Sequence, residues 1–261
     1  MMQLKAALLR LMLLAATLLV GISAIADDLI TPIPITADEA FDAVQTQTDP
    51  LDPNLEANVV LVDVRTRAEY YWVGAAAAVT EIVRNDGKPS ISPENGKVRL
   101  SHEGKFLDYN TIDGKSRRLQ VAKVEKLEMS PIAINIPFRL WDEETVSLVP
   151  NLNFVSGIQN LINNGAQILI LFCRTGGRSS TCAAEIPTAD VVKVTVYEID
   201  DYPPEDPSKG GYGGFEGSTY NNAYNGYVGF PGRLTEVQDT PSVSWKDSGL
   251  PMETFLNPLT P

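Results

Sequence analysis

The stretch QILILFCRTGGRSS, residues 167–180, joins the strongest strand signal of the chain to a loop rich in glycine and arginine. The apolar run that ends at Phe172 is typical of a strand buried on both faces of a parallel sheet. The residues after the loop, SSTCAAEI, predict a helix over 179–186 that ends at Pro187. The stretch therefore predicts a strand, a short loop that begins with Cys173, and a helix.

The alternation of strands and helices continues on both sides of this stretch. A helix is predicted over 35–44, where Thr36 and Glu39 form a capping box. Further predicted elements are strands over 59–64, 131–137 and 191–199, a helical turn over 67–73, and a helix over 153–165 that stops at Gly165. This order predicts an α/β protein with a central parallel sheet flanked by helices on both faces.

Two segments interrupt the pattern. Residues 76–130 are polar, with turn signals at Asp86-Gly87, Asn95-Gly96 and Asp113-Gly114. Residues 203–240 are rich in glycine and, up to 232, in aromatic residues. A low-complexity stretch is one interpretation of the second segment. Its aromatic density favours an ordered loop packed over the domain, because disordered segments are poor in aromatic residues.

The first 26 residues predict a secretory signal peptide. Lys5 and Arg10 give a basic start, an apolar run follows over 11–22, and Ala24-Ile25-Ala26 matches a small-x-small cleavage site. A membrane anchor is the alternative, but a spanning helix needs about 20 apolar residues and Arg10 interrupts this run. We expect residues 1–26 to be removed and 27–261 to form one domain in the periplasm, with no stable membrane anchor.

The charge of the chain is strongly negative, with 33 Asp and Glu against 21 Lys and Arg and a net charge of −12. A chain of this charge without a basic run repels nucleic acid and anionic lipid, so no nucleic-acid partner is expected. The single histidine, His102, lies in the polar insertion without companion ligands. We therefore expect no metal, and the sequence calls for no cofactor.

Cys173 and Cys182 are the two cysteines of the chain. In an exported protein such a pair is usually a disulfide. Here Cys173 ends a strand and Cys182 lies inside the next helix, a placement that disfavours the short Cα separation that a disulfide requires. The favoured interpretation of Cys182 is a small buried apolar residue.

The loop after Cys173 has the composition of an anion-binding site. It follows the carboxyl end of a predicted central strand, where open α/β sheets bind ligands. Gly176 and Gly177 permit backbone angles that turn N–H groups inward, with a helix N-terminus behind them. Arg174 and Arg178 add positive charge that suits an oxyanion. Such surroundings stabilise a thiolate, so Cys173 is predicted to be a nucleophile rather than an inert buried thiol.

Four motifs, in chain order, resemble those of rhodanese-type sulfurtransferases. CRTGGRS (173–179) is similar to the Cys-x-x-Gly-x-Arg-Ser loop of the single-domain members. LVDVRTRAEYYWVGA (61–75) is similar to their Asp-x-Arg-x-x-x-Glu-Tyr/Phe segment, matched by Asp63, Arg65, Glu69 and Tyr70. AINIP (133–137) and SWKDSGLP (244–251) resemble the segment that follows and the closing Trp-x-x-x-Gly-Leu-Pro. The resemblance covers 35–75, 131–201 and 243–252, and implies a rhodanese-like fold with two long insertions.

The chain also departs from the family pattern. The family joins the GA and NIP elements almost directly, whereas residues 76–130 intervene here, and 203–240 form a second insertion. The usual Gly-His-Ile before GA is replaced by Tyr71-Trp72-Val73. Either insertion is expected at a strand end or an edge of the domain, where it would cover the mouth of the site.

The resemblance implies a persulfide enzyme. Cys173 would accept a sulfane sulfur from a small anionic donor such as thiosulfate, and a thiol, cyanide or a protein acceptor would collect it. The residues that would bind the substrate are Arg174, Thr175, Gly176, Gly177, Arg178 and Ser179. Asp63, Arg65 and Glu69 are expected to support the loop, through a buried ion pair of Asp63 and Arg65 with Glu69 or with the backbone.

Two other functions stay open. Phosphatases with a Cys-x5-Arg loop are one alternative, but four residues separate Cys173 from Arg178, and Phe172 stands where those enzymes carry a histidine. They also require a nearby carboxylic acid to protonate the leaving oxygen. The second alternative is a rhodanese-like module that carries sulfur or binds a partner without turnover, since a fold does not fix a function.

Overall fold

The computed structural model describes residues 31–101, 103–174, 177–186, 194–199, 245 and 248–253. The predicted signal peptide over 1–26 and the second insertion over 203–240 lie outside the described residues. So do Thr175, Gly176 and His102. Within the described part of the chain, no helix is both long and apolar enough to cross a membrane.

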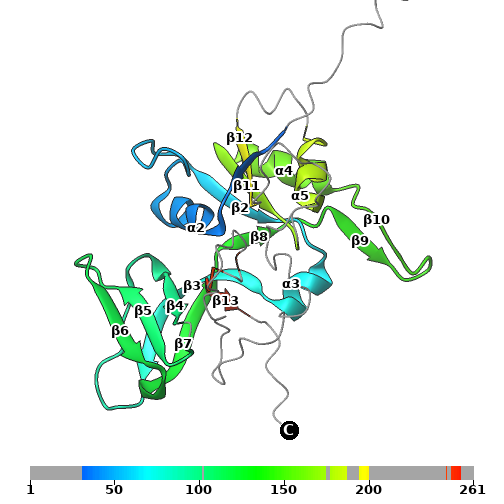
Figure 1. The fold of residues 1–261 in the computed structure, drawn as a ribbon. Coiled ribbons are helices and arrows are strands. Elements are labelled where there is room, and N and C mark those ends of the chain that lie inside the picture. The colour runs from blue at the N-terminus through cyan, green and yellow to red at the C-terminus, as the bar shows by residue number, and fades with distance from the viewer. Residues whose placement is uncertain are drawn as a thin grey trace, which may run out of the picture.

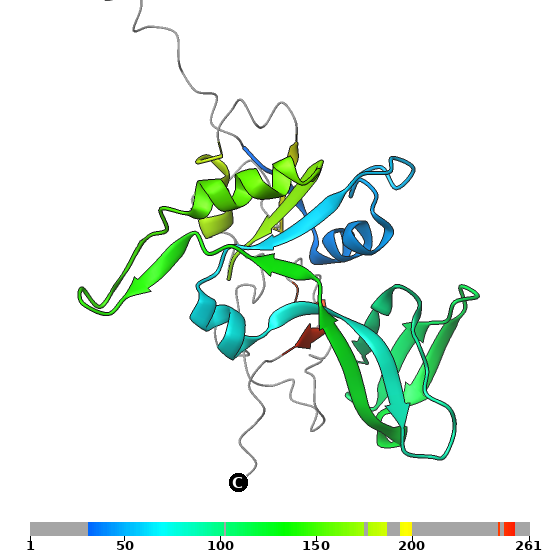
Figure 2. The same ribbon diagram turned by 180° about the vertical axis from the view of Figure 1, so that it is seen from behind.

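Five strands of the described chain form a parallel sheet in the order β1-β12-β11-β2-β8 (Figures 1 and 2). They are β1 (Ile33–Ile35), β2 (Val59–Asp63), β8 (Ala133–Asn135), β11 (Ile168–Phe172) and β12 (Thr195–Ile199). The helices are α2 (Ala37–Thr46), α3 (Arg67–Val73), α4 (Phe154–Asn163) and α5 (Gly177–Ala183). The predicted α/β class with a central parallel sheet is confirmed, and β11 is the middle strand.

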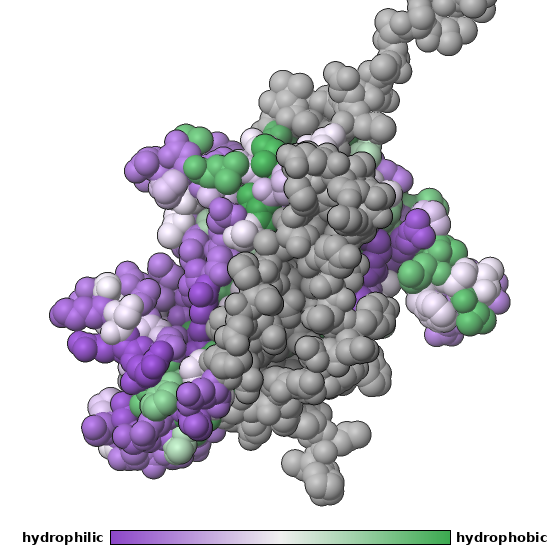
Figure 3. Space-filling view, viewed as in Figure 1, coloured by the Kyte–Doolittle hydropathy of each residue, from purple (hydrophilic) through white to green (hydrophobic). Residues whose placement is uncertain are grey.

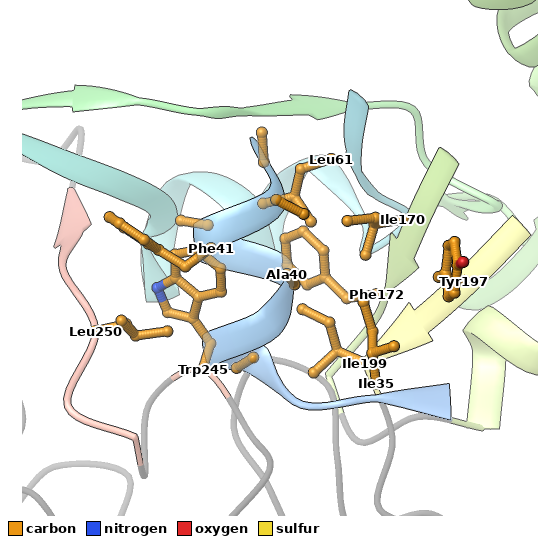
Figure 4. Packing of buried hydrophobic residues seen from close by; sticks show 14 of the residues in the cluster. Ile35, Ala40, Phe41, Leu61, Ile170, Phe172, Tyr197, Ile199, Trp245 and Leu250 are labelled. Carbon is orange, nitrogen blue, oxygen red and sulfur yellow. The ribbon is translucent and has the colours of Figure 1, made fainter. Parts of the chain in front are cut away.

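Both faces of the sheet are covered, which explains why all five residues of β11 are buried. On one face, Phe41 of α2 packs with Leu61, Ile170 and Phe172 of the strands and with Trp245 (Figure 4). On the other face, Leu169 and Leu171 of β11 pack with apolar residues of α4 and α5, among them Ile158, Ile162 and Cys182. The strand that carries Cys173 is therefore held between two hydrophobic layers.

The helices largely follow the sequence signals. Helix α2 begins after Thr36, whose side chain accepts a hydrogen bond from the Glu39 backbone while the Glu39 carboxylate accepts one from the Thr36 backbone. Helix α4 ends before Gly165, which has a φ of +95°. Helix α5 is a correction: it begins at Gly177, two residues before the predicted start, so Ser179 lies inside its first turn.

The first insertion folds as β structure with a hydrophobic core of its own. Strands β3 (Ala75–Arg84) and β7 (Val124–Pro131) pair antiparallel along their length. Strands β4 (Val98–Leu100), β5 (Phe106–Asn110) and β6 (Ser116–Gln120) form a separate antiparallel sheet (Figure 1). The core residues are Val79, Ile82, Val98, Leu100, Leu107, Leu119, Val124 and Leu127. The predicted turns are confirmed, since Gly87, Gly96 and Gly114 all have positive φ.

This β region packs against the parallel-sheet domain through charged residues. Lys97 forms salt bridges with Asp38 and Asp42 on α2, and Arg99 bonds Asp38. Lys97 also lies 5.7 Å from the centre of the Phe41 ring. The first insertion is thereby held against helix α2.

Two further antiparallel pairings complete the fold. Strand β13 (Met252–Glu253) pairs with the start of β3, which brings the end of the described chain next to Ala76. Strands β9 (Arg139–Asp142) and β10 (Ser147–Pro150) form a hairpin between β8 and α4. The hairpin projects from the body of the molecule in both ribbon views.

Candidate active site

Cys173 lies at the carboxyl edge of the parallel sheet, directly after β11. In the register of the sheet Phe172 is opposite Asp63, the last residue of β2, and the N–H of Val64 donates to the carbonyl of Phe172 at 2.9 Å. The fold therefore brings together Cys173 and the Asp63–Arg65 segment, which are far apart in the sequence. This is the edge where parallel α/β sheets bind ligands.

Among the residues that the structure describes, two donors face the sulfur of Cys173. The backbone N–H of Arg178 donates to Sγ at 3.3 Å, and the hydroxyl of Ser179 lies 3.8 Å from Sγ. Cys173 is only 1% exposed and Ser179 is fully buried. A negative charge on Sγ would be stabilised by these donors in a setting that excludes water.

The guanidinium of Arg178 is held by Glu69 of α3. The two side chains make a bidentate salt bridge, with Nη1–Oε2 at 2.8 Å and Nη2–Oε1 at 2.6 Å. Burial alone would raise the pKa of Glu69, but the bonds and charge of Arg178, together with the Thr66 bonds, lower it to about 2. The predicted role of Arg178 as an oxyanion clamp is therefore limited in this structure, because its guanidinium already binds a carboxylate.

Asp63 and Arg65 form a second, fully buried ion pair. Arg65 Nη2 lies 2.6 Å from Asp63 Oδ2, and the same nitrogen donates to the Gly74 carbonyl at 2.6 Å. Both side chains are 0% exposed. The Arg65 guanidinium also lies 5.7 Å from the centre of the Phe172 ring. The expected support through the backbone is therefore found for Arg65, whereas Glu69 binds Arg178 and not this pair.

Cys182 is a separate buried thiol. Both cysteines are free, which agrees with the prediction against a disulfide. The Cys182 thiol donates to the carbonyl of Ser179 at 3.1 Å. Burial raises the pKa of Cys182, and the nearby charge of Cys173 adds to this effect. Cys182 is thus kept protonated beside the site.

Of the other predicted substrate-binding residues, the structure describes Arg174 and Gly177 but not Thr175 and Gly176. Arg174 is half-buried and lies two residues after the end of β11, and Gly177 begins α5. Among the described residues there is no group of three His, Cys, Asp or Glu that could hold a metal ion. Surface cavities of about 570 and 580 Å³ lie elsewhere. One is lined by Gln167 and by residues of 46–48 and of 53–58, and the other by Lys97 and residues of β4, β5 and β6.

Besides the bridge between Glu69 and Arg178, two supporting contacts were not predicted from the sequence. Thr66 caps α3 through a capping box with Glu69, a motif that the Thr-x-x-Glu spacing could have revealed. Trp245, fully buried, stacks on Phe172 with ring centres 6.4 Å apart. No sequence spacing indicates that contact.

No protein-family model matches the chain, and no curated protein matches it. Function is therefore inferred below from the geometry of the site and from the sequence motifs.

Proposed function

We propose that this protein is a rhodanese-like sulfurtransferase that carries a sulfane sulfur as a persulfide on Cys173. The observation that carries the proposal is the backbone N–H of Arg178, in the first turn of helix α5, which is directed at Sγ of Cys173, the residue that follows the central strand β11. The four family-like motifs support it, because three of them meet at this one edge of the sheet. They are the Cys173 loop, the segment around Asp63, and the segment at Asn135, whose amide donates to the carbonyls of Asp63 and Arg65.

The proposed chemistry consists of two sulfur transfers. In the first, the Cys173 thiolate attacks the outer sulfur of thiosulfate; a new S–S bond forms, the S–S bond of the donor breaks, and sulfite leaves with the bonding electron pair. In the second, a thiophilic acceptor such as cyanide attacks the outer sulfur of the persulfide, and the Cys173 thiolate is released with thiocyanate as product. Each step is a nucleophilic displacement that needs no redox cofactor.

The chain's own residues hold the sulfur and orient the loop. The Arg178 N–H and the Ser179 hydroxyl stabilise negative charge on Cys173 Sγ. The Glu69–Arg178 bridge positions that N–H, and the Asp63–Arg65 pair fixes the end of β2 beside it. Burial of Cys173 shelters a persulfide from solvent, and donor access then requires neighbouring residues to move.

A non-turnover sulfur carrier is the second candidate. It is favoured by the engagement of Arg178 with Glu69 and by the 1% exposure of Cys173, both of which lower the attraction of the site for a free anion. The Glu69–Arg178 bridge also argues against a Cys-dependent phosphatase, whose arginine must face the phosphate. Cleavage of p-nitrophenyl phosphate that depends on Cys173 would support the phosphatase instead.

The test is to incubate residues 27–261 with thiosulfate, with and without cyanide. We expect Cys173 to gain the mass of one sulfur atom, and cyanide to remove it as thiocyanate. Cys173→Ser should lose both signals, while Cys182→Ser, the matched change at the other buried thiol, should keep them. An adduct without turnover would identify the carrier. The absence of both adduct and thiocyanate in the wild type would refute sulfur transfer.

A further inference from the structure

The β9–β10 hairpin exposes an unusual amount of apolar surface. Trp141 and Leu148 are directly opposite each other in the register of the hairpin and are 55% and 39% exposed. Val146, in the turn, is 69% exposed, and Leu152, just after β10, is 93% exposed. Figure 3 shows apolar residues gathered on this projecting arm. Large exposed apolar groups that are contiguous mark interaction sites more often than scattered ones do.

The hairpin has no core of its own that would explain these residues. Leu140 and Val149 form the next cross-strand pair, so their side chains lie on the face opposite to Trp141 and Leu148. A two-stranded ribbon with apolar residues on both faces cannot bury them within itself, and such a ribbon alone is marginally stable in water. The arrangement suits a ribbon that inserts into a groove of another molecule.

The base of the hairpin is anchored by hydrogen bonds and ring packing next to the candidate site. The N–H of Phe138 donates to the carbonyl of Val64 at 3.1 Å, and the N–H of Asn151 donates to the carbonyl of Phe138 at 3.1 Å. The Phe138 ring packs edge-on against Phe154 of α4, with centres 5.3 Å apart. Val64 in turn is hydrogen-bonded to Phe172, the residue before Cys173. The base of the hairpin therefore lies at the edge of the sheet where Cys173 lies, and the strands project outward from there (Figures 1 and 2).

The charge of the hairpin indicates the chemistry of its partner. Asp142, Glu143 and Glu144 lie at the turn, and Arg139, at the base of β9, is the one basic residue of 139–150. Glu143 and Glu144 are exposed. A complementary surface would have an apolar groove with lysine or arginine at its rim. A symmetric dimer formed through this hairpin is disfavoured, because it would bring two acidic turns together.

We propose that the β9–β10 hairpin is the docking element for a protein sulfur acceptor that has an apolar groove rimmed by basic residues. The identity of the partner as an acceptor rests on the proposed sulfur transfer. The groove receives Trp141 and Leu148 while the carboxylates of the turn contact its rim. Docking then places the acceptor thiol at the edge where the persulfide of Cys173 forms.

The test loads residues 27–261 with radiolabelled thiosulfate and offers the label either to cyanide or to the native protein fraction of the source cells. The double variant Trp141→Ser/Leu148→Ser should pass about tenfold less label to protein, and as much label to cyanide as the wild type does. Ile112→Ser is the matched control, since Ile112 is 81% exposed in the turn after β5, and it should equal the wild type in both transfers. Glu143→Lys/Glu144→Lys, and added salt with the wild type, should also slow transfer to protein.

The outcomes separate this proposal from the function on which it rests. A wild type that takes up no label on Cys173 refutes sulfur transfer itself. Two results would overturn docking alone, given a wild type that is labelled on Cys173 and transfers the label to cyanide. In the first, the wild type passes no label to protein. In the second, Trp141→Ser/Leu148→Ser passes as much label to protein as the wild type does. Equal loss toward cyanide in that variant also overturns docking. Self-association of the wild type that this variant abolishes would assign the hairpin to a second copy, which likewise contradicts the proposal.

Discussion

Helices α2 and α3 both begin with a capping box, in which a threonine and the glutamate three residues later satisfy each other's backbone N–H groups. In α2 the Glu39 carboxylate accepts from the backbone and hydroxyl of Thr36, at 2.7 and 2.8 Å. In α3 the Glu69 carboxylate makes the same two bonds to Thr66, both at 2.9 Å. Glu69 in addition binds the guanidinium of Arg178, in the loop that starts at Cys173.

The comparison teaches that one local motif serves two purposes, depending on what the fold brings near it. Glu39 stabilises the start of a helix. Glu69 does the same, and also fixes the residue whose N–H faces the Cys173 sulfur. The experiments below separate the stability that Glu69 contributes as the cap of α3 from the stability and activity that it contributes through its bridge to Arg178.

The largest expected difference is between Glu69→Gln and Glu39→Gln. Glutamine still completes a capping box, so both variants keep the local bonds. Glu69→Gln also leaves Arg178 without a charge partner in a largely buried position, which should cost about 2 kcal/mol of unfolding free energy. Glu39→Gln should cost about 0.5 kcal/mol or less. Urea unfolding measures both values.

The same pair of variants should differ in activity. Without the bridge, the Arg178 N–H is less firmly held, so the rate of sulfur loading on Cys173 at saturating thiosulfate should fall about tenfold in Glu69→Gln. Glu39→Gln should load at the wild-type rate. Equal losses in the two variants would mean that the bridge has no positioning role.

A double-mutant cycle sharpens the comparison. In the free energy of unfolding, Glu69→Gln and Arg178→Gln should show a coupling energy of about 1–3 kcal/mol, because both variants remove the same bridge. Glu39→Gln and Arg178→Gln should be additive within about 0.5 kcal/mol. A coupling for Glu69 as small as that for Glu39 would show that the bridge contributes little to stability.

The last prediction concerns the pH dependence of the free energy of unfolding. The folded pKa of Glu69, about 2, lies below its ordinary value of 4.5, since Arg178 and Thr66 outweigh the burial that would raise it. A carboxylate with a lowered pKa contributes stability above the pKa of the unfolded chain and loses it as pH falls through the folded pKa. The advantage of the wild type over Glu69→Gln should therefore be constant near neutral pH and shrink between about pH 5 and pH 2. A constant advantage across that range would contradict this prediction.

The sequence predicted what short-range patterns encode. Strands β2, β8, β11 and β12 of the parallel sheet, the capping box of α2 and the stop at Gly165 were read from local spacing and confirmed. The three-residue edge strand β1 was not predicted, and its last residue, Ile35, was assigned to the helix that follows. The hydrophobic core of the first insertion was missed, because its residues, such as Val79, Leu107 and Leu119, are separated by polar turns and meet only after the strands pair.

In the candidate site, too, the sequence indicated residues within a motif but not contacts between distant segments. Asp63, Arg65, Glu69 and Cys173 were singled out from motifs, and the fold brings their segments together. The partner of Glu69 was not predicted, because the bridge joins residues 109 positions apart. The hairpin with Trp141 and Leu148 was not predicted either, since its pairing is visible only in the register of the two strands.

The contact of Trp245 with Phe172 has a consequence for the order in which this protein folds. Trp245 also packs on Phe41, with ring centres 5.6 Å apart, and donates its indole N–H to the Pro251 carbonyl. The layer beneath the Cys173 strand is therefore assembled from the first and last parts of the described chain. Contacts of such long sequence separation close late and slowly in folding. During synthesis, Cys173 leaves the ribosome well before Trp245, so the face of β11 that packs against α2 lacks the Trp245 indole until the last part of the chain has been made.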